Sequence, residues 1–126
     1  MSQAMFDKGL KVRKEVLGAE YVDAAIKNAD DFTRPFQELV TEYAWGAVWG
    51  REGLSRKTRS MLNIAMLTTL NRPHELKLHI HAALGNGVTQ EEVREILMHV
   101  AIYAGVPAAV DAFRTGREVF SEAAKA

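Results

Sequence analysis

The sequence predicts an all-α protein, a single domain of six to seven short helices over residues 1–126. Apolar residues recur at helical spacing throughout the chain, whereas the alternating pattern and tight turns of β-hairpins are missing. Glycines, prolines and capping residues fall where such helices should begin or end. A length of 126 residues also fits one domain of ordinary size.

The N-terminal segment has a clear helix and a shorter one after it. Residues 3–17 carry a loose apolar stripe, and Gly18 follows at the position where glycine commonly closes a helix. A short helical turn is expected at residues 21–27. Gly18 and the two residues that follow it therefore separate these two elements.

A long helix is predicted next. Asp30 or Asp31 can cap its start, and apolar residues keep i, i+3, i+4 spacing as far as Trp49. Pro35 falls in the first turn, where its missing N–H costs least. Residues 49–53, which contain two glycines, then form a loop.

Two helices are predicted in the middle of the chain. Ser55 is a good N-cap for the first, whose segment 61–70 is apolar on nearly every side. We therefore expect this segment at the centre of the domain or at a contact between subunits. Pro73 can begin the second helix, which runs to Leu84 and ends at residues 85–87.

The last two helices have the clearest sequence signals. Thr89 and Glu92 have the spacing of a capping box at the start of one helix. Gly105 ends it, and Pro107 begins the final helix. Each has an apolar stripe, formed by Val93, Ile96, Leu97, Val100, Ala101 and Ala104 in the first and by Ala109, Ala112, Phe113, Gly116 and Phe120 in the second.

Composition excludes several classes of function. The 16 Lys and Arg balance 16 Asp and Glu, and no basic patch stands out, so nucleic-acid binding is not expected. With no cysteine there can be no disulfide, thiol nucleophile or thiolate metal site. The start of the chain lacks a signal-peptide pattern, and no uncharged run is long enough to span a bilayer. We therefore expect a cytoplasmic protein without membrane partners.

Three histidines crowd the helix that begins at Pro73. His74 and His79 resemble a zinc-protease motif, but five positions place them about 140° apart around the helix, so they cannot share one ion. Glu75 and His79 are four apart and lie on one face, where the carboxylate can polarise the imidazole. Such pairs are also common on solvated helices. His81 faces another direction, about 200° from His79.

Arginines form a second constellation. Arg56 and Arg59 share a helical face near a helix start that favours anions, while Arg51 and Arg72 lie in the loops on either side. Converging guanidinium groups could bind a substrate with two carboxylates. The alternative is an ordinary solvated basic turn. Trp45 and Trp49 are similarly more typical of a core or an interface than of a ligand wall.

The chain resembles the γ-carboxymuconolactone decarboxylase (4-carboxymuconolactone decarboxylase) family. Six segments spread over nearly the whole chain carry the resemblance: residues 12–18, 44–49, 58–60, 75–79, 86–89 and 101–109. The resemblance implies an alkylhydroperoxidase-like helical bundle that assembles as a homo-oligomer, a trimer or a hexamer. The strongly apolar segment at residues 61–70 independently suggests a homo-oligomer.

Redox enzymes with the alkylhydroperoxidase-like fold carry two cysteines, a histidine and an acidic residue at set positions. The resemblance matches each of these positions to a residue of this chain. Their family histidine falls on His79, their two cysteines on Arg72 and Glu75, and their acidic residue on Ser60. Because every thiol is absent, peroxidase or disulfide-reductase chemistry by the thiol route is excluded.

The implied reaction is decarboxylation of a lactone dicarboxylate, 4-carboxymuconolactone, to the β-ketoadipate enol-lactone in protocatechuate catabolism. The substrate supplies its own electron sink, so no cofactor or metal is expected. We expect His79, oriented by Glu75, to act as the acid or oxyanion donor, with His81 as the alternative donor. Arg59, Arg51 and Arg72 are expected to bind the substrate carboxylates. Trp45 is expected to form an apolar wall.

Two other functions remain open on the sequence alone. One is another cofactor-free, non-redox enzyme of the same superfamily that acts on a small acidic substrate. The other is a structural or interaction module, which would lack a pocket that joins His79 to an arginine.

Overall fold

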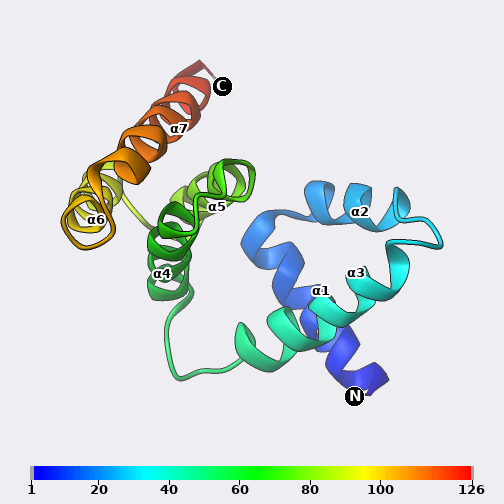
Figure 1. Ribbon diagram of the computed structural model, residues 1–126. Coiled ribbons are helices and arrows are strands. Elements are labelled where there is room, and N and C mark those ends of the chain that lie inside the picture. Colours follow the sequence, from blue (N-terminus) through cyan, green and yellow to red (C-terminus); the bar gives the residue numbers. More distant parts are fainter. Residues whose placement is uncertain (1, 126) are drawn as a thin grey trace. The chain divides into compact units, whose positions relative to one another are not determined.

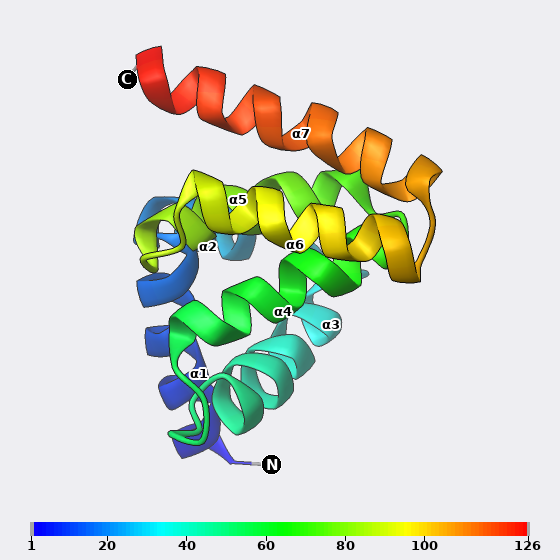
Figure 2. The same ribbon diagram turned by 90° about the vertical axis from the view of Figure 1, so that its left-hand side faces the viewer.

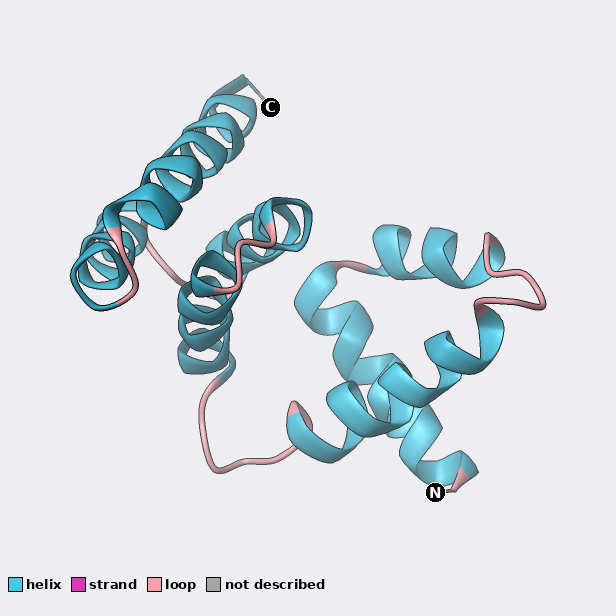
Figure 3. Cartoon of the chain, in the orientation of Figure 1, coloured by secondary structure: helices cyan, strands magenta, loops and turns pink. Residues whose placement is uncertain are grey.

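A computed structural model describes residues 2–125 of the chain, and all regular structure in that range is helical (Figures 1 and 3). The elements are α1 (Gln3–Leu17), α2 (Ala19–Lys27), α3 (Arg34–Val40), the π-helix η1 (Thr41–Val48), α4 (Arg56–Thr69), α5 (Pro73–Gly85), α6 (Gln90–Tyr103) and α7 (Val106–Lys125). The all-α prediction is confirmed. No helix in the described range is long and apolar enough to cross a membrane.

The chain divides into two compact units, Met1–Ser55 and Arg56–Ala126. The N-terminal unit contains α1, α2, α3 and η1, and the C-terminal unit contains α4 to α7. The prediction of one domain over residues 1–126 stays a prediction.

In the N-terminal unit, α1 packs against η1. Two glycines permit the close approach of these helices, because a Cβ on Gly9 would overlap the carbonyl oxygen of Thr41. A Cβ on Gly46 would lie 2.6 Å from the carbonyl oxygen of Met5. The predicted first helix and its end at Gly18 are confirmed, and Gly18 has a φ of 98°.

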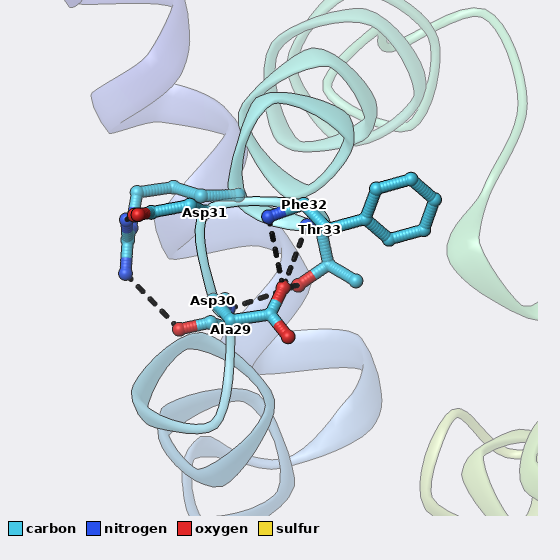
Figure 4. A network of polar contacts seen from close by, with 6 residues as sticks. Ala29, Asp30, Asp31, Phe32 and Thr33 are labelled. Atoms are coloured by element: carbon cyan, nitrogen blue, oxygen red, sulfur yellow. Dashed lines mark hydrogen bonds and ion pairs between the residues drawn. The ribbon is translucent and has the colours of Figure 1, made fainter.

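A hydrogen-bonded turn precedes α3 (Figure 4). Oδ1 of Asp30 accepts hydrogen bonds from the amides of Thr33, at 2.9 Å, and Phe32, at 3.0 Å, and from the Thr33 hydroxyl at 3.1 Å. These bonds, that of the Thr33 amide first, lower the pKa of Asp30. The prediction that Asp30 can cap this helix is confirmed by these bonds and by its carbonyl, which accepts from the Arg34 amide at 2.8 Å, although the regular α-helix begins only at Arg34.

The second half of the predicted long helix is different from expectation. From Thr41 to Val48 the backbone is π-helical, with hydrogen bonds to the fifth residue back. The amide of Trp49, for example, donates to the carbonyl of Ala44 at 2.9 Å. Pro35 does lie in the first turn of α3, as predicted. Apolar spacing does not distinguish a π-helix from an α-helix over two turns.

In the C-terminal unit, the pairs α4 and α5, α6 and α7, α4 and α6, and α5 and α7 pack together. Figure 2 shows α7 returning alongside α6 after the short connection between them. All four helices contribute to a buried apolar core, whose largest members include Ile64, Leu76, Ile80, Val93, Leu97 and Val119.

The capping box at the start of α6 is confirmed. The Thr89 amide donates to the Glu92 carboxylate at 2.9 Å, and the Glu92 amide donates to the Thr89 hydroxyl at 3.1 Å. Helices α4, α5 and α7 begin within one residue of their predicted starts, and α2 begins two residues earlier than predicted.

The apolar segment at residues 61–70 is not enclosed on every side. Helix α4 buries Ile64 and Thr68, but Leu62, Met66 and Leu70 are 45%, 51% and 66% exposed. The expectation that this segment lies wholly at the centre of a domain is therefore wrong for this face. Its other interpretation, a contact between subunits, stays a prediction.

Candidate active site

The candidate site lies in the C-terminal unit, where α4 and α5 pack together. His79 projects from the middle of α5 and is half-buried. The side-chain amide nitrogen of Asn63, on α4, lies 3.4 Å from Nδ1 of His79. This contact joins two helices at the residue that the sequence placed at the centre of the site.

Burial controls the charge of His79. Desolvation lowers the pKa of His79 from its ordinary value, and the negative charge of Glu75 partly opposes this effect by raising it. Because the desolvation effect is the larger of the two, His79 is neutral at pH 7. A neutral imidazole can donate one hydrogen bond and accept one.

The contact with Asn63 also favours one tautomer of His79. An amide nitrogen can only donate, so this contact favours the tautomer in which Nδ1 of His79 accepts and Nε2 carries the proton. An imidazole in this state can give a hydrogen bond from Nε2 to an oxygen on which negative charge develops.

Arg59 lies on the same helix as Asn63, one turn earlier and on the same face. Its Nε atom is buried. The neighbouring Ser60 is fully buried, and its hydroxyl accepts a hydrogen bond from the side chain of Asn86 at 3.1 Å. Arg59 therefore lies next to a buried, hydrogen-bonded residue of α4, on the face that bears Asn63.

The other predicted residues of α5 lie elsewhere. Glu75 is exposed and acts on His79 through its charge. His81 is also exposed and lies two residues beyond His79, on a different face of the helix. Nothing in the geometry brings the two histidines together, so the assignment of His81 as the alternative donor stays a prediction.

Arg72 is the N-cap residue of α5 and is exposed. It helps to line a cavity of about 10 Å³ with residues of α4 and α7, among them Thr68 and Asp111. This cavity is too small for a substrate, since ligand pockets typically reach about 300 Å³ or more. The assignment of Arg72 to a carboxylate clamp stays a prediction.

Trp45 and Arg51 belong to the N-terminal unit. Trp45 is only 7% exposed, and its ring centroid lies 4.9 Å from that of Trp49, which is also buried. This is the core aromatic pair that the sequence suggested as the more ordinary interpretation. Arg51 lies in the exposed loop after η1. Their roles as an apolar wall and a clamp stay predictions.

Asn63 was missed by the sequence reasoning. It lies within the segment at residues 61–70, whose apolar character dominates the sequence pattern. Its position four residues after Arg59, on one helical face, was the available signal. An amide in an otherwise apolar stretch usually has a buried partner to satisfy, and here the partner is His79.

No group of three or more His, Asp or Glu side chains in residues 2–125 is arranged to hold a metal ion. Two sizeable cavities of the C-terminal unit are not lined by His79. One, of about 730 Å³, lies between α6 and α7, and the other, of about 480 Å³, lies between α4 and α6.

Comparison with known proteins identifies relatives along most of the chain. The chain is 50% identical over 112 residues to nitrosuccinic acid decarboxylase npaB of Metarhizium robertsii, which covers 89% of this chain and 78% of the relative. It is 44% identical over 117 residues to 4-carboxymuconolactone decarboxylase of Acinetobacter baylyi, covering 93% and 87%. An uncharacterized 15.0 kDa protein of Paracoccus denitrificans is 32% identical over 130 residues, covering 95% and 93%.

The family model for the carboxymuconolactone decarboxylase family matches residues 34–118, a range that includes Asn63, Glu75 and His79. This match covers more than half of the chain, and the relatives above agree with it. The resemblance seen in the sequence is confirmed: the chain belongs to the carboxymuconolactone decarboxylase family.

Proposed function

We propose that this protein, a decarboxylase, converts 4-carboxymuconolactone to the β-ketoadipate enol-lactone and CO2 without a cofactor. The observation that carries the proposal is the identity of 44%, over 93% of the chain, to a decarboxylase named for that substrate. The geometry around His79 supports it, because a neutral imidazole held by Asn63 suits a reaction that needs an oxyanion donor.

The reaction makes limited demands on the protein. The bond between the ring carbon and the leaving carboxylate breaks, and CO2 departs. The electron pair moves through the ring double bond into the lactone carbonyl, which gives a dienolate. A proton then adds to carbon and restores the lactone. No external electron acceptor is required, because the lactone carbonyl receives the electrons.

The residues of the C-terminal unit have a natural division of roles. His79 donates a hydrogen bond from Nε2 to the lactone carbonyl oxygen, where the negative charge grows. Such a donor is worth about 3–4 kcal/mol of transition-state stabilisation. Asn63 fixes the tautomer that makes this possible. Arg59 binds the carboxylate that is retained, since a guanidinium matches a carboxylate in charge and shape.

Decarboxylation of nitrosuccinic acid is the second candidate. The relative with 50% identity is named for that reaction, which favours it specifically. Its chemistry is closely similar, because loss of CO2 from the carbon that bears the nitro group sends the electron pair into that group. The resulting nitronate is then protonated on carbon. Both substrates are small dicarboxylates that carry their own electron sink.

A direct substrate comparison tests the proposal. Purified protein is given each acid separately in buffer with a chelator, and CO2 release and lactone absorbance are followed against the rate without protein. We expect turnover of the lactone with kcat/KM at least about 100-fold above that for nitrosuccinate, a difference of about 2.7 kcal/mol. A reversed preference would replace the first candidate by the second. Turnover of neither acid would make both wrong.

A further inference from the structure

The cavity between α6 and α7 has features of a binding site. It has a volume of about 730 Å³, which is within the range of small-molecule pockets. Val93, Leu97, Phe113 and Phe120 supply its apolar lining. Figure 2 shows the two helices that form it, which run back along each other.

The polar lining of the cavity is strongly cationic. Arg94, Arg114 and Arg117 contribute three guanidinium groups, and no Asp or Glu side chain lines the cavity. Arg114 forms an ion pair with Asp111, which does not line the cavity. Within residues 2–125, the side chains of Arg94 and Arg117 form no hydrogen bond or ion pair. Two positive charges beside the cavity are therefore not neutralised by neighbouring side chains.

We propose that this cavity binds an amphipathic anion, a carboxylate attached to an aromatic or alicyclic body. The apolar residues accept the body of such a ligand, and Arg94 and Arg117 bind its carboxylate. A ligand without charge would leave the arginines unpaired, and a purely polar anion would leave the aromatic surface exposed. Both requirements together define the ligand class.

This site is separate from the candidate active site. None of Arg59, Asn63 and His79 lines the cavity, which is built from α6 and α7 rather than from the face shared by α4 and α5. The proposal therefore does not depend on which acid the protein decarboxylates. The cavity would bind an effector or a second organic acid.

Two fluorescent probes with the same body test the charge requirement. Anilinonaphthalene sulfonate carries an anion, and phenylnaphthylamine is its neutral counterpart. We expect the wild-type protein to bind the anionic probe at one saturable site, and naphthoate to displace it. Arg94→Gln and Arg117→Gln should each weaken binding of the anionic probe about tenfold, because each removes one charged hydrogen-bond donor. Binding of the neutral probe should not change.

Two control variants sharpen the test. Lys125→Gln removes a positive charge from the same helix outside the cavity and should leave affinity unchanged. Arg114→Gln removes a guanidinium that is already paired with Asp111 and should have a smaller effect than Arg117→Gln. Exposed arginines are replaced, so the variants should keep wild-type helicity by circular dichroism and wild-type decarboxylation.

The proposal is overturned by either of two results. One is equal affinity of the anionic probe for the wild type and the two arginine variants, which would reduce the cavity to an apolar patch. The other combines two observations. The wild-type protein does not bind the anionic probe, and replacement of Arg94 or Arg117 lowers the molar mass measured by light scattering. That result would identify a second copy of the chain as the occupant.

Discussion

Each of the two units buries an ionisable side chain, but the two side chains respond differently to the loss of water. In the N-terminal unit, Arg13 is only 6% exposed and donates hydrogen bonds to the side chains of Gln37, at 2.9 Å, and Thr41, at 3.2 Å. In the C-terminal unit, the half-buried His79 contacts the amide of Asn63 at 3.4 Å. Desolvation lowers the pKa of both side chains.

The difference follows from what each group does when it is desolvated. A guanidinium stays charged in proteins, so its burial requires hydrogen-bond acceptors from neighbouring helices. An imidazole can lose its proton instead, and its neutral form remains able to donate and accept. Arg13 thus joins α1 to α3 and η1. His79, by contrast, retains in its neutral form one N–H that can donate a hydrogen bond in a reaction.

The largest expected effect is on turnover at His79. His79→Gln should lower kcat for decarboxylation about 10²–10³-fold, because the donor to the developing oxyanion is lost. The matched control is His81→Gln on the same helix, which changes an exposed histidine and should alter kcat by less than about threefold. Steady-state kinetics on both proteins provide the measurement. Equal losses in the two variants would remove the distinction between the buried and the exposed histidine.

The next effect is on stability at Arg13. Arg13→Ala should lower the free energy of unfolding by about 2–4 kcal/mol, because it opens a cavity and leaves the Gln37 side-chain oxygen without its donor. Lys14→Ala, the next residue of α1, breaks the partly exposed pair with Asp23 and should cost less than about 1 kcal/mol. Urea unfolding followed by circular dichroism measures both. If the two costs were the same, Arg13 would not join the helices as its contacts indicate.

A smaller effect is expected for the positioning residue Asn63. In Asn63→Asp, a carboxylate replaces the amide donor, favours a proton on Nδ1 of His79 and raises its pKa. We expect kcat to fall about tenfold with little change in KM, and the pH profile of kcat to move to higher pH. Asn63→Ala should reduce kcat without this change of the pH profile. An unchanged profile in Asn63→Asp would mean that Asn63 does not set the protonation of His79.

Much of the fold follows from local sequence signals. The end of α1 at Gly18, the capping box of Thr89 and Glu92, and the start of α5 at Pro73 depend on residues a few positions apart. Local chemistry decides these points. The π-helix after Val40 does not follow from local signals, because its apolar spacing is also that of an α-helix. Its packing against α1 involves Gly9, more than thirty positions away in the sequence.

The candidate site divides in the same way. The sequence places Glu75 near His79, because the pair lies within one turn of one helix. Asn63 comes from another helix, so its contact with His79 depends on how α4 packs on α5. Burial of His79, which sets its charge, depends on the same packing. Helical periodicity gives the face of a residue, but not the neighbour that this face meets.

The smallest effect concerns the dependence of stability on pH. The pKa of His79 is lower in the folded chain than its ordinary value of 6.5, and desolvation is the main cause. Below pH 6.5 the unfolded chain therefore binds a proton at this residue before the folded chain does. Stability rises with pH wherever the unfolded state binds more protons, so this contribution favours unfolding as the pH falls.

The comparison of wild type with His79→Gln isolates this contribution, because the other three histidines are present in both proteins. Stability is measured by urea unfolding between pH 7.5 and 5, a range in which ordinary carboxylates stay ionised. We expect the wild type to lose stability relative to His79→Gln as the pH falls below about 6.5, the ordinary pKa of histidine. Parallel curves would mean that His79 titrates as it does in water. The imidazole would then resemble an exposed histidine, and the contrast with Arg13 would rest on hydrogen bonding alone.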